Sequence, residues 1–174
     1  MRFTELSLKG AYLVEPQPHE DNRGFFVRTF CAREFRNHGL VDAFVQCNTS
    51  WNAVEGTVRG MHYQRPPSSE VKLVRCTAGA LWDVIVDLRP DSPSYLQHVG
   101  VELSARNRLA LYVPEMFAHG FQTLEEGTEV FYQMSEFYEL ELSAGLRYDD
   151  PKLGIKWPLP VSIVSEKDRT QALL

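Results

Sequence analysis

Apolar and polar residues alternate over many short stretches of this chain, and turn-forming residues separate the stretches about every 8–12 positions. Alternation with a period of two is typical of β-strands that bury one face. The predicted strands span residues 3–12, 23–30, 44–50, 57–64, 71–77, 81–88, 99–103, 108–113, 117–124 and 129–138. Many short strands with regular turns predict an all-β fold, either a sandwich or a barrel-like double sheet.

The turns suggest how some strands pair. Only Ala78-Gly79-Ala80 lies between two predicted strands, and a linker this short predicts a hairpin. Residues 99–103 and 108–113 are expected to form a second pair across a turn-prone linker. Residues 16–22 are polar and proline-rich, and they are interpreted as a turn.

Two short helices are expected, one near each end of the chain. Residues 31–38 form the better candidate, because Phe35 follows Cys31 by four positions and Gly39 suits a helix C-terminus. A second short helix is expected after Ser165. Since there is no repeat, linker or low-complexity segment, residues 1–174 are interpreted as a single domain.

Several strands are apolar on both faces, as in residues 82–86. One face can fill the space between two sheets, and the other can pack on a further sheet or on a second subunit.

Composition narrows the class of protein. The net charge of −5 argues against a nucleic-acid or membrane-surface partner, which would favour excess positive charge. There is no signal peptide pattern, and no apolar run is long enough to span a bilayer. Three cysteines without CxxC spacing indicate reduced thiols, and therefore a cytoplasmic protein.

The strongest candidate chemistry lies in the strand at residues 57–64. His62 follows Arg59 and Gly60, and Lys72 comes ten residues later. A base and a cation are what proton abstraction beside a carbonyl requires. In a regular strand Arg59 and His62 point to opposite faces, so a shared pocket requires an irregularity, for which Gly60 is the best position. The alternative reading of His62 is a core histidine.

Tyr132 is a second candidate. It shares a strand face with Val130 and Met134, so we expect it to point inward, where a phenol needs a hydrogen-bond partner. A core tyrosine is the alternative. His62 and His119 lack the additional close-spaced ligand of a metal site, since position 64 is Gln64. No metal or other cofactor is therefore expected, and no glycine-rich nucleotide motif is present.

Eight segments of the chain resemble, in order, the dTDP-4-dehydrorhamnose 3,5-epimerase family. They are Asp21–Phe26, Val45–Ser50, Arg59–Gln64, Lys72–Val74, Asp83–Arg89, Pro114–Phe121, Asp149–Pro151 and Ser165–Asp168. The resemblance implies a cupin-type jelly-roll double-sheet barrel, a cytoplasmic homodimer and a metal-free site. It also implies a nucleotide-diphosphate 4-keto-6-deoxy sugar as substrate.

The resemblance also implies roles for individual residues. His62 would be the base, oriented by Asp168; Lys72 would stabilise the enolate; and Tyr132 would be the acid. The substrate-binding residues would be Arg23, Gln46, Asn48, Arg59, His119, Tyr138 and Lys167. Arg23, Arg59 and His119 would meet the diphosphate.

The chain departs from the family pattern at several positions. Arg28 and Ser143 stand where the family usually has Glu, Cys47 where Asp is common and Met116 where Gly is common. We hypothesise that Arg28 and Ser143 mark a shifted substrate. Two alternatives remain open: a single-site epimerase or ketoisomerase on another nucleotide-linked 4-keto sugar, and a non-catalytic cupin that binds sugar nucleotides.

Overall fold

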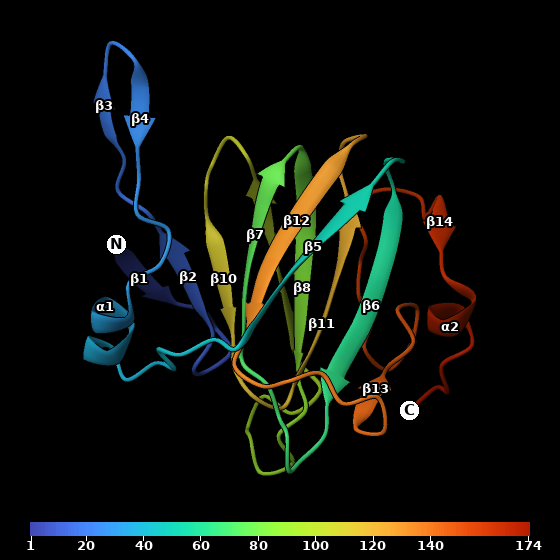
Figure 1. Cartoon of the computed structure of the whole chain (residues 1–174). Coiled ribbons are helices and arrows are strands. Elements are labelled where there is room, and N and C mark those ends of the chain that lie inside the picture. Colours follow the sequence, from blue (N-terminus) through green and yellow to red (C-terminus); the bar gives the residue numbers. More distant parts are fainter.

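The computed structural model describes all 174 residues and consists mainly of two β-sheets that face each other (Figure 1). The first sheet contains, in spatial order, β1 (Arg2–Glu5), β2 (Tyr12–Glu15), β10 (Ala110–Val113), β7 (Lys72–Ala78), β12 (Thr128–Met134) and β5 (Gln46–Asn52). The second contains β13 (Ser143–Gly145), β6 (Thr57–Gln64), β11 (Phe117–Thr123), β8 (Ala80–Asp87) and β9 (His98–Ser104), and β14 (Ile163–Val164) pairs with β6. The predicted all-β double sheet is confirmed.

The main core includes residues from both sheets. Leu81 and Ile85 of the second sheet belong to the same buried cluster as Leu111 and Val130 of the first. These side chains are the inward-facing residues of their strands, so the period of two in the sequence determines which residues enter this core.

Both predicted strand pairs are wrong. β7 lies in the first sheet and β8 in the second, and β9 and β10 are divided in the same way. The turn between β7 and β8 carries the chain from one sheet to the other. Gly79 has φ of +71° there, and a Cβ atom would lie 2.5 Å from Thr128 Oγ1. Alternation identifies a strand but does not specify its partner.

The N-terminal region also differs from the prediction. Residues 3–12 belong to two antiparallel strands, β1 and β2, rather than one. Only Gly24–Phe26 (β4) of the predicted strand at 23–30 is extended, and it pairs with β3 (His19–Asp21), where a turn was expected. All six strand residues of this hairpin are exposed, and Figure 1 shows it projecting from the body of the molecule.

The apolar outer faces are covered by other parts of the same chain. Helix α1 (Ala32–Asn37) buries Phe35 in a cluster with Leu73 and Tyr112 of the first sheet. Val84 and Val86 of the second sheet pack with apolar residues of the segment that follows β13. Double-sided burial is therefore confirmed, and these contacts are intramolecular.

Helix α2 (Glu166–Arg169) follows the predicted start at Ser165, whose Oγ accepts a hydrogen bond from the backbone N–H of Asp168 over 3.1 Å. The two predicted short helices are thus confirmed. Neither has the length and apolarity needed to cross a membrane.

Candidate active site

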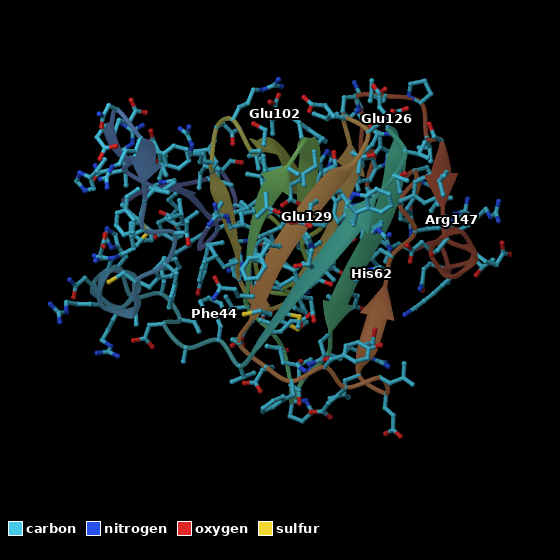
Figure 2. The ribbon with its side chains drawn as sticks, turned by 45° about the horizontal axis from the view of Figure 1, so that its top comes forward. Phe44, His62, Glu102, Glu126, Glu129 and Arg147 are labelled. Atoms are coloured by element: carbon cyan, nitrogen blue, oxygen red, sulfur yellow. The ribbon has the colours of Figure 1, made fainter.

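A cavity of about 730 Å³ is lined by residues of β5, β6, β7, β11 and β12 and of the C-terminal segment. Figure 2 shows His62 on β6, the strand beside which the C-terminal segment runs. The predicted site residues that line this cavity are Arg59, His62, Lys72, His119, Tyr132, Lys167 and Asp168. They come from distant parts of the sequence, and the double sheet brings them together.

An irregularity in β6 allows Arg59 and His62 to share the cavity. His62 pairs with His119 and Arg59 with Phe121, so β6 uses one residue more than β11 between these two pairs. Gly60 lies in this bulge with φ of +113°, and a Cβ atom there would be 2.6 Å from Gly120 Cα. The predicted irregularity at Gly60 is confirmed, and it depends on close backbone approach.

His62 forms a hydrogen-bonded pair with Asp168. The His62 Nε2 atom donates to Asp168 Oδ1 over 2.6 Å, and the Gly60 N–H donates to Oδ2 over 3.3 Å. The His62 side chain is 41% exposed, whereas that of Asp168 is 4% exposed. Burial alone would raise the pKa of Asp168, but the hydrogen bond and charge of His62 and the Gly60 N–H lower it below its usual value. An ionised carboxylate therefore orients an accessible imidazole.

Lys72 and Tyr132 lie on the first sheet, whereas His62 lies on the second. The ammonium group of Lys72 is buried and forms an ion pair with Glu70. Burial raises the pKa of the Tyr132 phenol, the charge of Glu70 raises it further, and Asn48 and Arg59 act in the opposite direction. Tyr132 is consequently kept in its protonated form, which is the form that can donate a proton.

A second histidine–aspartate pair lies beside the first. His119 Nε2 donates to Asp83 Oδ1 over 2.5 Å, and Asp83 is completely buried. Asp83 Oδ2 has no hydrogen-bond partner. The resemblance pointed to His119 and not to its carboxylate. A charged residue within the apolar run 81–86 was the available signal for Asp83.

A smaller lobe of about 260 Å³ shares His62, Lys72, Tyr132 and Lys167 with the main cavity. Asn48, Tyr138, Ser143 and Glu70 also line it. Gln46 lines neither lobe, but its side-chain oxygen accepts a hydrogen bond from the backbone N–H of Tyr138 over 2.7 Å. Gln46 thus positions the peptide of a predicted binding residue.

Arg23 does not reach the cavity within one chain. It lies in the turn of the projecting β3–β4 hairpin, where its guanidinium pairs with Asp21 over 2.5 Å. Arg28 is also outside both lobes, with a side chain that is 63% exposed and 3.9 Å from Glu34. Ser143 is therefore the altered position that does line the site.

Two further partners were missed from the sequence. Asn52 Oδ1 accepts a hydrogen bond from Arg59 Nε over 2.6 Å, and Glu70 holds Lys72. Spacing alone did not indicate either contact, because the first joins strands of different sheets, β5 and β6, and the second depends on burial. No group of three or more His, Cys, Asp or Glu side chains is placed to hold a metal ion.

The arrangement places an imidazole and a phenol on opposite walls. His62 comes from one sheet, Tyr132 from the other, and Lys72 lies beside Tyr132 in the lobe that all three share. A carbon between the two walls can lose a proton to one and gain a proton from the other. A buried ammonium beside them suits an oxyanion that develops in between.

Comparison with known proteins gives the family. The model for dTDP-4-dehydrorhamnose 3,5-epimerase matches residues 5–174. The chain belongs to this family. It is 44% identical over 175 residues to the dTDP-4-dehydrorhamnose 3,5-epimerase of Sinorhizobium fredii, covering 100% of this chain and 90% of that protein.

Solved structures of family members confirm the predicted cupin-type jelly roll. The dTDP-4-dehydrorhamnose 3,5-epimerase of Bacillus anthracis, solved with TDP and pyrophosphate bound, has a TM-score of 0.96 at 42% identity and covers 99% of both chains. A 3'-monoepimerase from Streptomyces bikiniensis, in complex with dTDP-quinovose, has a TM-score of 0.90 at 30% identity, covering 97% of this chain and 85% of its own. The family therefore includes an enzyme described as a single-site epimerase.

Proposed function

We propose that this protein is an isomerase that converts dTDP-4-dehydro-6-deoxy-D-glucose to dTDP-4-dehydro-L-rhamnose by inverting C3 and C5. The observation that carries the proposal is the placement of His62 and Tyr132 on opposite sheets around one lobe that also holds Lys72. Inversion requires a proton to leave one face of a carbon and another to arrive at the opposite face. Residues 1–174 would act as one catalytic domain.

The first step is proton removal by His62 from a carbon next to the C4 ketone. The electron pair of the broken C–H bond forms the carbon–carbon double bond of an enolate, and the carbonyl π pair moves to the C4 oxygen. Lys72 faces this oxyanion, and stabilisation of that kind contributes roughly 10²–10³ in rate. The carbon–carbon π pair then takes the Tyr132 proton from the opposite face to form the new C–H bond, while an electron pair on the C4 oxygen re-forms the ketone. The cycle repeats at the second carbon after His62 has lost its proton to water and Tyr132 has regained one from water.

The remaining residues would bind the nucleotide diphosphate. Arg59 is held by Asn52, and His119 is held by Asp83, so both are preorganised beside His62. Guanidinium and imidazolium groups suit phosphate oxygens. Lys167 would add a further positive charge, and Asn48 and Tyr138 would contact the nucleotide from the smaller lobe. The TDP and pyrophosphate bound to the Bacillus anthracis relative support a nucleotide diphosphate as the ligand.

A homodimer would complete the site. Arg23 was predicted to meet the diphosphate, yet it lies on a projecting hairpin outside the cavity of its own chain. The same hairpin exposes Phe25 and Phe26, at 51% and 71%. A second copy that received this hairpin would bury the aromatic rings and gain Arg23. Sedimentation should show a dimer at micromolar concentration, whereas a monomer with full activity would contradict this role for Arg23.

Single-site epimerisation is the second candidate. Ser143 replaces the usual family Glu and lines the lobe with His62, Lys72 and Tyr132. Loss of a carboxylate there removes a charged hydrogen-bond acceptor for the sugar. Without it, the sugar ring can fail to reorient so that its second carbon lies between His62 and Tyr132. The 3'-monoepimerase relative supports this candidate.

Product analysis by proton NMR tests both candidates. The wild type should convert dTDP-4-dehydro-6-deoxy-D-glucose to a sugar inverted at C3 and C5, and should convert UDP-, GDP- and CDP-linked analogues much less. Inversion at one carbon would establish the second candidate. A folded protein that converts none of the four substrates would contradict the proposal. The free thiols of Cys31, Cys47 and Cys76 support placing this activity in the cytoplasm.

A further inference from the structure

Glu70 and Lys72 form a buried ion pair at the wall of the candidate active site. The exposed fraction is 9% for the Glu70 side chain and 8% for the Lys72 side chain. Glu70 Oε1 accepts a hydrogen bond from Lys72 Nζ, while Glu70 Oε2 is buried and has no partner. Both residues line the lobe that contains His62 and Tyr132. A buried carboxylate with a hydrogen-bond partner on only one of its two oxygens is unusual, and its position at the cavity wall suggests a role in the reaction.

The buried ammonium of Lys72 has lost most contact with water and requires a nearby negative charge as compensation. Burial disfavours the ammonium form, and a neutral amine is a poor electrostatic partner for an enolate. Glu70 supplies the compensating charge. It is the only carboxylate that lines the smaller lobe, and Asp168, which lines the main cavity, is already occupied by His62.

We propose that Glu70 is a positioning residue that keeps Lys72 charged and directs its ammonium group toward the ketone oxygen of the substrate. This inference rests on the proposed function, in which Lys72 stabilises the enolate. Glu70 precedes Lys72 by two positions and lies just outside β7, so its side chain reaches the ammonium from the end of the strand. The remaining N–H groups of Lys72 stay available for the substrate.

Glu70 also acts on the acid. Its negative charge is one of the causes that raise the pKa of Tyr132, after burial. Arg59 opposes the shift, and the other ionisable groups that line the two lobes with Tyr132 are His62, Tyr63, Lys72, His119, Tyr138, Lys167 and Asp168. Removal of Glu70 should therefore weaken both the charged state of Lys72 and the protonated state of Tyr132.

The first test follows the charge of Lys72 directly and needs no substrate. The chain contains five lysines, so the side-chain NMR signals of Lys72 can be assigned by their loss in Lys72→Arg. In Glu70→Gln, which keeps the shape and removes the charge, the Lys72 ammonium signal should titrate away at a lower pH than in the wild type. An unchanged titration would overturn the proposal.

The second test is kinetic. Glu70→Gln should slow deuterium exchange beside the ketone about tenfold at neutral pH, move the alkaline limb of the rate profile to lower pH, and change KM less than about twofold. In a Lys72→Met background the same substitution should have little further effect on exchange, because exchange reports enolate formation, in which Glu70 acts through Lys72 rather than through Tyr132. Additive losses, or an unchanged pH profile, would contradict the proposal.

Glu102→Gln is the matched control. Glu102 is exposed on β9, and Figure 2 shows it at an edge of the molecule away from His62. It should behave as the wild type in both tests. If the wild type shows no exchange but Lys72 still titrates earlier in Glu70→Gln, the proposed reaction is wrong and the charge-holding role of Glu70 stands. If the wild type shows exchange but the Lys72 titration is the same in Glu70→Gln, the proposed reaction stands and the charge-holding role of Glu70 is wrong.

Discussion

His62 on β6 lies directly opposite His119 on β11, and each imidazole donates its Nε2–H to a different buried aspartate. The two pairs differ in access. The His62 side chain is 41% exposed and that of His119 is 10% exposed. An accessible ring suits proton transfer, whereas a recessed ring suits a fixed contact with a bound group. The bulge at Gly60 separates this histidine pair from Arg59, so that one strand directs both His62 and Arg59 into the cavity.

Asp168→Asn should reduce catalysis by about 10³-fold, because an amide cannot hold the imidazole in the same tautomer or stabilise its charged form. Deuterium exchange beside the ketone is the measurement. Asp149→Asn is the control, since Asp149 is an exposed carboxylate paired with Arg147. Equal losses in the two variants would contradict a special role for Asp168.

Asp83→Asn should act on binding rather than on chemistry. The recessed His119 would lose the carboxylate that stabilises its charged form, and a phosphate would lose a partner. We expect KM for the nucleotide sugar to rise about tenfold while kcat stays within about threefold. Calorimetry with TDP should show the same loss of affinity. A lower kcat with unchanged TDP affinity would instead place His119 in the proton transfer.

Tyr132→Phe should separate enolate formation from inversion. The ring still fills its place on β12, but the proton donor for the opposite face is gone. Exchange of the substrate hydrogens with D2O should persist within about tenfold, while formation of inverted product falls by about 10²-fold or more. Equal loss of exchange and inversion would mean that Tyr132 is needed to form the enolate.

Asp87 should make the fold sensitive to acid. Burial would raise its pKa, but hydrogen bonds from Arg89, Ser92 and Ser94 outweigh burial and hold the pKa far below the usual value. The unfolded chain therefore binds this proton more readily, so stability from Asp87 is full above about pH 4 and declines as pH falls further.

Urea unfolding between pH 6 and pH 3 checks this expectation. The free energy of unfolding of the wild type should fall more steeply than that of Asp87→Asn, which should be less stable at pH 6 by roughly 3 kcal/mol. Parallel curves for the two proteins would show that Asp87 does not contribute to the acid transition.

The strands could be predicted better than their pairing. Residues 57–64 match β6 because alternation and the following prolines mark its limits. An irregularity at Gly60 followed from the requirement that Arg59 and His62, on opposite faces of a regular strand, share one pocket. The separation of β7 from β8 could not be predicted, because a short glycine turn is compatible with a hairpin and with a crossing between sheets. The β3–β4 hairpin was missed because it contributes no buried side chain to a periodic pattern.

The candidate site, like the fold, was predicted only in part. His62, Lys72 and Tyr132 were predicted, and the resemblance placed Asp168 beside His62 from a distance of 106 positions. Glu70 and Asp83 were not predicted, because a single acid near an apolar run does not reveal which cation or imidazole it will meet. The sequence shows an acid within the apolar run 81–86, but the partner of such an acid depends on how distant strands pack.

The most direct test of the central claim is site-specific deuterium incorporation in D2O, measured by proton NMR on dTDP-4-dehydro-6-deoxy-D-glucose with wild type and His62→Ala. The wild type should lose the C3 and C5 signals, and His62→Ala should lose neither at a comparable rate while remaining folded. His98→Ala, which removes an exposed histidine of β9, should match the wild type. Normal exchange in His62→Ala at either carbon would contradict His62 as the base there.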